Sequence, residues 1–124
     1  MPKVSYVYRA QVLDVLDGDT LLILIDQGMH NQRREKLRLA RVNAPEMSTP
    51  EGEPAKVYAT RWVHGGAANA LADGWPFIVA TAKATGSPGI DNYGRYLCEI
   101  WRLDTGENLG DDLLRSGHAK IYGT

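Results

Sequence analysis

The sequence predicts a mainly β protein of the α+β class, in which five strands form a small barrel with two packed helices. Three observations lead to this prediction. The first half of the chain alternates apolar and polar residues with the period of two that is typical of strands. A helical pattern follows the third expected strand, and two more strands and a short amphipathic helix follow it. Five strands with a helix after the third match an OB-type barrel.

The expected strands are short and are separated by turn residues. They are predicted at residues 4–16, 20–25, 35–42, 77–84 and 96–103. Asp17, Gly18 and Asp19 predict a hairpin turn between the first two strands, because an Asp-Gly pair suits the positive φ of a tight turn. Residues 26–34 are polar and rich in turn formers, and prolines interrupt residues 43–53, so both segments are predicted as loops.

The third strand and the two helices have simple patterns. In that strand Leu37 and Leu39 are expected to face the core, with Lys36 and Arg38 on the opposite face. Pro54 suits the first position of a helix, which is predicted to run to about residue 72, although two central glycines weaken its second half. A second helix is predicted at 109–116, with a glycine directly after it as its stop signal.

Composition indicates one soluble domain over residues 1–124. The chain is 44% hydrophobic and 23% charged, which is ordinary for a globular protein and argues against disorder. Its one cysteine, Cys98, lies in an apolar stretch and is expected in the core. The start of the chain has no signal-peptide pattern and no segment is long and apolar enough to span a membrane, so we expect a cytoplasmic protein. No obligate protein partner is evident, and a monomer is expected.

Two clusters of residues could carry chemistry in the first half of the chain. Asp17 and Asp19 place two carboxylates on one turn, which suits a hard cation such as calcium or magnesium, although such residues are also common in plain hairpins. Arg38 lies on a strand and Glu46 follows just after its end. An arginine can bind phosphate with two hydrogen bonds, and a glutamate can orient or deprotonate water. A solvated strand face and a surface acid would give the same pattern.

A third cluster is the glycine-containing loop at residues 91–95. It supplies Arg95 and, two residues earlier, Tyr93. Two arginines, one from each cluster, could stabilise the charge that develops on a phosphate during in-line attack. The tyrosine could stack on a base or pack against a sugar. Alternatively, Arg95 simply pairs with Asp91 in an ordinary loop.

Charge does not suggest a strongly basic nucleic-acid binder. The formal net charge is −1, whereas nonspecific polyanion binders are usually strongly basic. Five of the 14 basic residues nevertheless fall in nine positions: Arg33, Arg34, Lys36, Arg38 and Arg41. This stretch is either an electrostatic footprint for a polyanion or a solvated face, and the sequence favours neither.

Taken together and in this order, the clusters resemble the thermonuclease family of staphylococcal nuclease-like domains. The resemblance rests on residues 15–20 (VLDGDT), 37–46 (LRLARVNAPE), 91–95 (DNYGR) and 114–120 (LRSGHAK). It extends over nearly the whole chain. It implies a nuclease that hydrolyses phosphodiesters of DNA or RNA with a bound calcium ion, or with magnesium or manganese, leaving a 3′-phosphate and a 5′-hydroxyl.

The resemblance also implies a role for each matching residue. Asp19, Asn43 and the main-chain oxygen of Ala44 would be metal ligands, with Asp17 behind them. Glu46 would hold or activate the attacking water. The phosphate would be bound by Arg38 and Arg95, and the nucleotide by Tyr93.

One residue departs from the family pattern in a way that affects function. Asn43 stands where the family usually has a second aspartate ligand. An Asn side-chain oxygen can bind calcium but carries no charge, so we expect a weaker metal site. The departure keeps a competing hypothesis open: a catalytically inactive OB-fold module that binds nucleic acid or protein.

Overall fold

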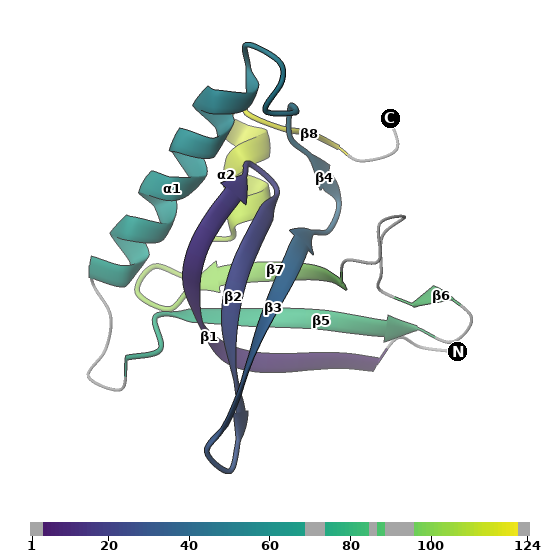
Figure 1. The fold of residues 1–124 in the computed structure, drawn as a ribbon, viewed down its shortest axis with the longest axis vertical. Helices are drawn as coiled ribbons and strands as arrows, with labels where there is room; N and C mark the ends of the chain where they lie inside the picture. Colours follow the sequence, from purple (N-terminus) through teal and green to yellow (C-terminus); the bar gives the residue numbers. More distant parts are fainter. Residues whose placement is uncertain (1–3, 69–73, 85–86, 89–95, 122–124) are drawn as a thin grey trace.

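The computed structural model describes residues 4–68, 74–84, 87–88 and 96–121. Five strands form the barrel (Figure 1): β1 (Val4–Asp17), β2 (Thr20–Gly28), β3 (Asn31–Leu39), β5 (Phe77–Ala84) and β7 (Tyr96–Arg102). Their order is β1-β2-β3-β7-β5, and pairing between β1 and β5 closes the barrel. The β3–β7 pair is parallel and the others are antiparallel. The predicted five-stranded OB-type barrel is therefore confirmed.

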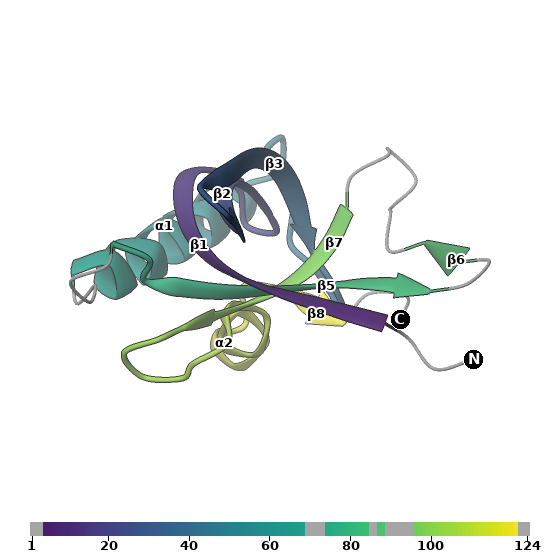
Figure 2. The same ribbon diagram turned by 90° about the horizontal axis from the view of Figure 1, so that it is seen from below.

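Two helices cover one side and one end of this barrel. Helix α1 (Gly52–Ala68) packs against β1, and α2 (Leu109–Ser116) packs against α1 and β7 (Figures 1 and 2). The stacked rings of Trp62 and Phe77, with centroids 5.6 Å apart, join α1 to the barrel. Cys98 is buried in the same core, as expected, and burial raises the pKa of its thiol. None of the described helices is both long enough and apolar enough to span a membrane.

The helix boundaries largely follow the capping signals. Helix α2 begins after Asn108, whose side chain accepts a hydrogen bond from the Asp111 N–H, and ends at Gly117, which has the left-handed φ of 82°. Helix α1 begins at Gly52, two residues before the predicted start at Pro54. Its described part ends at Ala68, and the rest of its predicted length lies outside the described residues.

The prediction of a loop at residues 26–34 is wrong. Strands β2 and β3 continue through this segment as a two-stranded ribbon, with Asp26 opposite Gln32 and Gly28 opposite Asn31. Met29 and His30 form the turn with φ of 53° and 61°, which are unusual values for non-glycine residues. The ribbon extends past the barrel (Figure 1), so its residues are mostly exposed and the apolar alternation stops while the backbone pairing continues.

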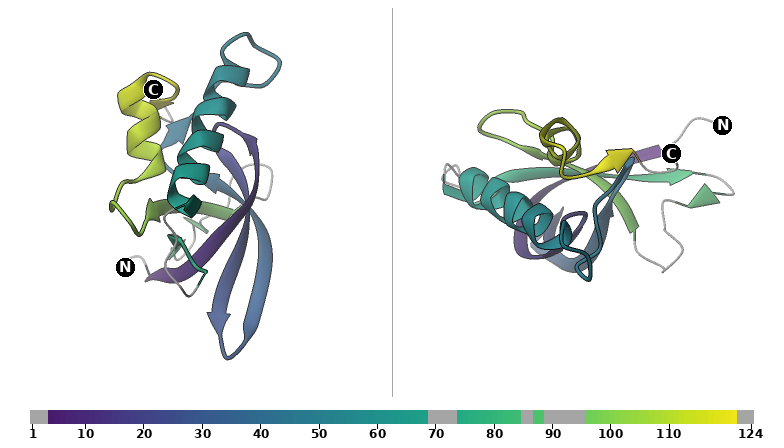
Figure 3. Two further views of the ribbon diagram at one scale, coloured as in Figure 1. Left: turned by 90° about the vertical axis from the view of Figure 1, so that its left-hand side faces the viewer. Right: turned by 90° about the horizontal axis from the view of Figure 1, so that it is seen from above.

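The predicted third strand, residues 35–42, is also corrected. Strand β3 ends at Leu39, the chain bends at Arg41, and a two-residue strand, β4 (Val42–Asn43), pairs with β8 (Lys120–Ile121). Arg41 has a φ of 69°, and its guanidinium is held by Glu99 and Asp111 at 2.5–3.0 Å. The bend separates β4 from the barrel wall, and the two short strands lie together at the end of the molecule that also holds the β1–β2 turn (Figure 3).

Candidate functional site

Four of the predicted site residues meet at one end of the barrel. Asp19 lies in the β1–β2 turn, Arg38 near the end of β3, Asn43 in β4, and Ala44 directly after it. Nη2 of Arg38 donates to Oδ2 of Asp19 at 3.3 Å and to Oδ1 of Asn43 at 3.0 Å. The Ala44 N–H donates to the same Asp19 oxygen at 2.9 Å. The Asp19 carboxylate thus joins the β1–β2 turn to Ala44, which lies 25 positions farther along the chain.

Asp19 is buried, and both of its carboxylate oxygens accept hydrogen bonds. Only 7% of the residue is exposed. Oδ1 accepts from the Thr20 hydroxyl at 3.1 Å, and the Asp19 N–H donates to the Asp17 carboxylate at 3.1 Å. Burial, with a smaller effect of the neighbouring Asp17, raises the pKa of Asp19 to about 6, against the opposing effects of the Ala44 N–H and Arg38. Asp17 therefore lies directly beside Asp19.

Arg38 differs from an ordinary charged residue on a strand face. Its side chain is on the face of β3 opposite to the side chains of Leu37 and Leu39, as predicted, yet the residue is only 6% exposed. Its Nη1 donates to the main-chain oxygen of Leu39 at 3.0 Å, which fixes the guanidinium beside Asp19. The interpretation of Arg38 as part of a solvated face is therefore wrong, because the β1–β2 turn and β4 cover it.

Gly18 is needed for a reason that differs from the predicted one. Its φ is not in the left-handed region, so the turn does not require the positive φ that an Asp-Gly hairpin suggested. A Cβ at this position would instead lie 2.8 Å from Cβ of Ala44 and 3.0 Å from Cβ of Ala55. The turn can approach β4 and α1 closely only because residue 18 has no side chain.

Glu46 lies on the loop that joins β4 to α1 and is exposed. Its main-chain oxygen accepts hydrogen bonds from the Thr49 N–H at 2.9 Å and from the Thr49 hydroxyl at 2.6 Å. A Cβ on Gly52 would lie 2.1 Å from that same oxygen. Among the described residues the Glu46 side chain forms no hydrogen bond or ion pair, so the structure does not join it to Asp19 or Arg38.

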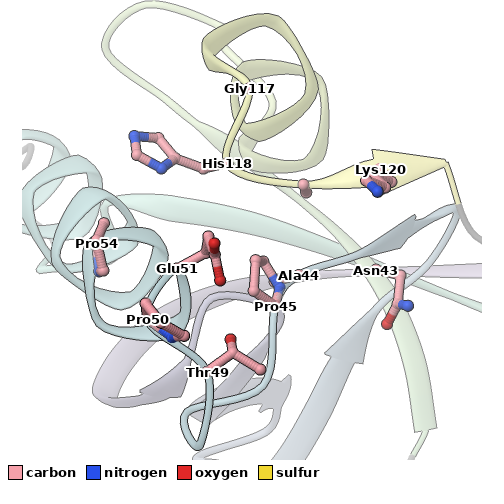
Figure 4. Close-up of a pocket in the computed structure, with 11 residues that line it drawn as sticks. Asn43, Ala44, Pro45, Thr49, Pro50, Glu51, Pro54, Gly117, His118 and Lys120 are labelled. Carbon is pink, nitrogen blue, oxygen red and sulfur yellow. The ribbon is translucent and has the colours of Figure 1, made fainter.

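A pocket of about 750 Å³ opens beside Asn43 and Ala44 (Figure 4). The β4–β8 pair, the loop before α1, and the segment after α2 surround it. Its lining contains Pro45, Pro50 and Pro54 on one side and His118 and Lys120 on the other. A volume of this size is within the range of small-molecule sites, so the end of the barrel presents a space adjoining the Asp19–Arg38 pair.

The oxygen donors at this site fit a hard cation, though with little charge. Oδ2 of Asp19 and Oδ1 of Asn43 already converge on one positively charged nitrogen, Nη2 of Arg38. Carboxylate, amide and main-chain oxygens are the usual ligands of calcium. Only Asp19 brings a negative charge among the three expected ligands, and no group of three His, Cys, Asp or Glu side chains gathers anywhere in the described part of the chain.

The expected site is thus assembled in part. Asp17, Asp19, Arg38, Asn43 and Ala44 lie together, while Glu46 stands apart on its loop. Tyr93 and Arg95 lie outside the described residues. Sequence reasoning missed the roles of Arg41 and Gly52 in placing β4 and the Glu46 loop. Nothing in their local sequence signals these roles, which depend on contacts with segments distant from them or on a close backbone approach.

Comparison with protein families matches residues 36–124 to the staphylococcal nuclease homologue family. The match contains Arg38, Asn43, Ala44 and Glu46, and begins after the Asp19 turn. Comparison with curated proteins gave no match.

Proposed function

We propose, because the chain belongs to the staphylococcal nuclease homologue family, that it hydrolyses phosphodiester bonds of DNA or RNA. The observation that carries the proposal is that the buried Arg38 contacts both the buried Asp19 and the exposed Asn43. A buried arginine and a buried carboxylate are costly for stability, and such groups are retained mainly where they serve a site. Here they contact Asn43 and Ala44, which line the pocket.

Three residues would hold the metal ion, which we propose is calcium. They are Asp19, Asn43 through its side-chain oxygen, and Ala44 through its main-chain oxygen. When bound, the ion would polarise a phosphate oxygen and neutralise part of its charge. Asp17 hydrogen-bonds the Asp19 N–H and so holds the turn that carries the main ligand.

Arg38 and Arg95 would bind the scissile phosphate and stabilise the charge of the transition state. The Nη1 contact with the Leu39 carbonyl anchors the Arg38 guanidinium, so little side-chain freedom is lost when it binds phosphate. Glu46 would orient or deprotonate the attacking water, a role that suits an exposed carboxylate on a loop held by Thr49. Tyr93 would contact the nucleotide.

The nuclease proposal is tested by incubating the purified protein with denatured DNA and with RNA, in calcium, in magnesium and in EDTA. We expect digestion that requires metal. A Glu46→Ser/Arg95→Gly double variant of the same chain should lose it. Failure to digest either substrate under any metal, with the protein folded by circular dichroism, would reject the enzyme.

A second function is favoured by one specific observation. Asn43 gives the site one carboxylate where the family pattern has two, and Arg38 already neutralises that carboxylate. These features suit a catalytically inactive barrel that binds nucleic acid through Arg38 without a metal. In the same assay this module would bind the oligonucleotide in EDTA and digest nothing.

Asn43→Asp should lower the calcium concentration required for half-maximal binding. The change adds a second negative charge beside Asp19, and ligand charge is a main determinant of calcium affinity. Calcium titration followed by the shift in thermal unfolding measures it without any substrate. Asn31→Asp, at the exposed ribbon turn, makes the same charge change far from the site and should have little effect. An unchanged or weaker titration curve in Asn43→Asp would reject Asn43 as a ligand.

A further inference from the structure

The pocket beside β4 contains three charged or titratable side chains that the proposed nuclease site does not use. His118 and Lys120 come from the segment after α2, and Glu51 comes from the loop before α1 (Figure 4). None of the three forms a side-chain hydrogen bond or an ion pair with another residue in the described ranges. Their polar atoms are therefore free to bind a ligand in this cavity of about 750 Å³.

The walls of the pocket are held in place before any ligand binds. Pro45, Pro50 and Pro54 line one side, and each proline ring fixes the φ of its residue. On the other side the His118 ring lies against the Tyr58 ring, with centroids 4.9 Å apart. The His118 N–H donates to a main-chain oxygen of α2 at 3.0 Å. A preformed pocket of this kind loses little conformational entropy when it binds a ligand.

The charges on these walls suit a ligand with one negative charge. Lys120 supplies one positive charge, and the His118 ring supplies an N–H donor. Phosphate dianions are bound best by the paired N–H groups of arginine, and no described arginine lines the pocket. Glu51 would repel a second negative charge on the ligand, whereas it can accept a hydrogen bond from an N–H or O–H group. A carboxylate therefore fits the pocket better than a phosphate.

The rest of the lining is mostly apolar. The three proline rings present apolar surface, and Ala44 and Ala119 add methyl groups. An aromatic ring that packs against these side chains removes apolar area from water on both partners.

We propose that the pocket binds a small aromatic carboxylate that also carries an N–H or O–H donor. The carboxylate pairs with Lys120 and accepts a hydrogen bond from His118. The ring packs against the three prolines, and the donor reaches Glu51. Such a ligand differs in chemistry from a polynucleotide, so its binding does not depend on nuclease activity.

Occupation of the pocket should also strengthen the proposed calcium site. Lys120 lies directly opposite Asn43 in the β4–β8 ladder, where side chains are close neighbours, and Asn43 and Ala44 both line the pocket. The Lys120 ammonium therefore disfavours a cation at Asn43, and a carboxylate paired with Lys120 offsets that repulsion. Calcium and the carboxylate must strengthen each other by the same factor, which we expect to be about threefold because solvent screens these exposed charges.

The test is titration of indoleacetate into isotope-labelled protein in EDTA, followed by NMR of the backbone amides. The amide signals of Thr49, Glu51 and Ala119 should shift, while that of Gln32 on the exposed ribbon should not. N-Methylindoleacetate lacks the N–H donor and should bind about threefold more weakly. Tryptamine carries an ammonium in place of the carboxylate and should not bind. Absence of shifts at the pocket amides, or equal binding of tryptamine, would overturn the proposal.

Lys120→Gln should weaken the binding of indoleacetate about tenfold, because one charge-assisted hydrogen bond is lost. Lys120→Arg keeps the charge and should bind like the parent. The matched control is Lys36→Gln, which makes the same charge change at an exposed residue of β3 outside the pocket lining and should also bind like the parent. Equal weakening in Lys120→Gln and Lys36→Gln would show an effect of net charge only and overturn the carboxylate site.

Calcium titration with and without indoleacetate, followed by thermal unfolding, measures the coupling between the two sites. A protein that binds indoleacetate in EDTA but shows no response to calcium would support the carboxylate site and reject the calcium site. Calcium binding that indoleacetate leaves unchanged would overturn the coupling.

Discussion

Gly52→Ala should lower the free energy of unfolding by about 3 kcal/mol, at the upper end of what an overpacked site costs. The added Cβ would lie 2.1 Å from the main-chain oxygen of Glu46 and 2.7 Å from Cα of Met47. Both are backbone atoms, so no side-chain rotation relieves the clash and the loop itself must move. Chemical denaturation of the two proteins measures the difference.

The same change should reduce nuclease activity beyond its effect on folding. Glu46, for which we propose a catalytic role, belongs to the loop that must move, and misplacing a catalytic group by about 1 Å can cost a factor of about 100. Activity measured well below the unfolding transition separates the two effects. If the variant retains full activity, the contribution of Glu46 to activity does not depend on the geometry of its loop.

Gly65→Ala is the matched control for this prediction. It makes the same substitution in the same helix, but the added Cβ would meet only the guanidinium of Arg102, 3.1 Å away. That group ends a long side chain, which can give by a few tenths of an ångström while keeping its hydrogen bonds to Asp104 at 2.6 and 2.9 Å. Because alanine favours a helix interior over glycine, we expect a change between no effect and a gain of about 1 kcal/mol. A loss as large as that of Gly52→Ala would show that the helix, and not the loop contact, causes the effect.

The barrel could be predicted because each of its strands carries its own local pattern. Strands β5 and β7 lie where apolar and polar side chains alternate in the sequence. Helix α2 begins and ends at the capping residues that the sequence indicates. The ribbon could not be predicted in this way. Beyond Ile25 its side chains leave the core, so hydrophobic periodicity ends, whereas the cross-strand hydrogen bonds continue to Gly28. Backbone pairing without burial leaves no apolar pattern in the sequence.

The site was predictable in chemistry and less so in geometry. The residue types of Asp19 and Arg38 were informative, because carboxylate and guanidinium are suited to metal and phosphate. Their contact follows from the β2–β3 register, in which Thr20 lies opposite Arg38. The contact of Arg38 with Asn43 was not predictable, since it depends on the bend at Arg41 that brings Asn43 over the end of β3. That bend is held by Glu99 from β7 and Asp111 from α2, which are distant in sequence. Non-local ion pairs of this kind leave no local signature.

Burial of Arg38 has a consequence for how the site binds cations. Its guanidinium contacts two of the three expected metal ligands, Asp19 and Asn43, so it already supplies positive charge at the point where those oxygens meet. A calcium ion would share the carboxylate with this internal cation. We therefore expect weak calcium affinity for two structural reasons: the missing charge at Asn43 and the charge already present on Arg38.

Asp19→Asn should abolish the stabilisation of the protein by calcium and yet increase its stability in EDTA at neutral pH. The folded-state pKa of Asp19 is about 6, above its ordinary value of 3.8. Folding therefore favours the protonated carboxyl, and ionisation of Asp19 at neutral pH costs about 3 kcal/mol. Asparagine avoids that cost and its oxygen can still accept the Ala44 N–H. It leaves Arg38 with the Leu39 and Asn43 oxygens, so we expect a net gain of about 1–2 kcal/mol.

The raised pKa of Asp19 also predicts how the stability difference between Asp19→Asn and the parent should change with pH. The contribution of a raised carboxyl pKa to stability is fully present below pH 4 and is lost as pH rises through about 6. The advantage of Asp19→Asn over the parent should therefore be absent near pH 4 and grow to its full size by pH 7. Denaturation in EDTA across this range measures it, with Asp14→Asn, an exposed carboxylate on β1, as the control for charge alone. A less stable Asp19→Asn protein at pH 7 would mean that the Arg38 pair outweighs desolvation, which would make the Asp19–Arg38 contact primarily a structural ion pair.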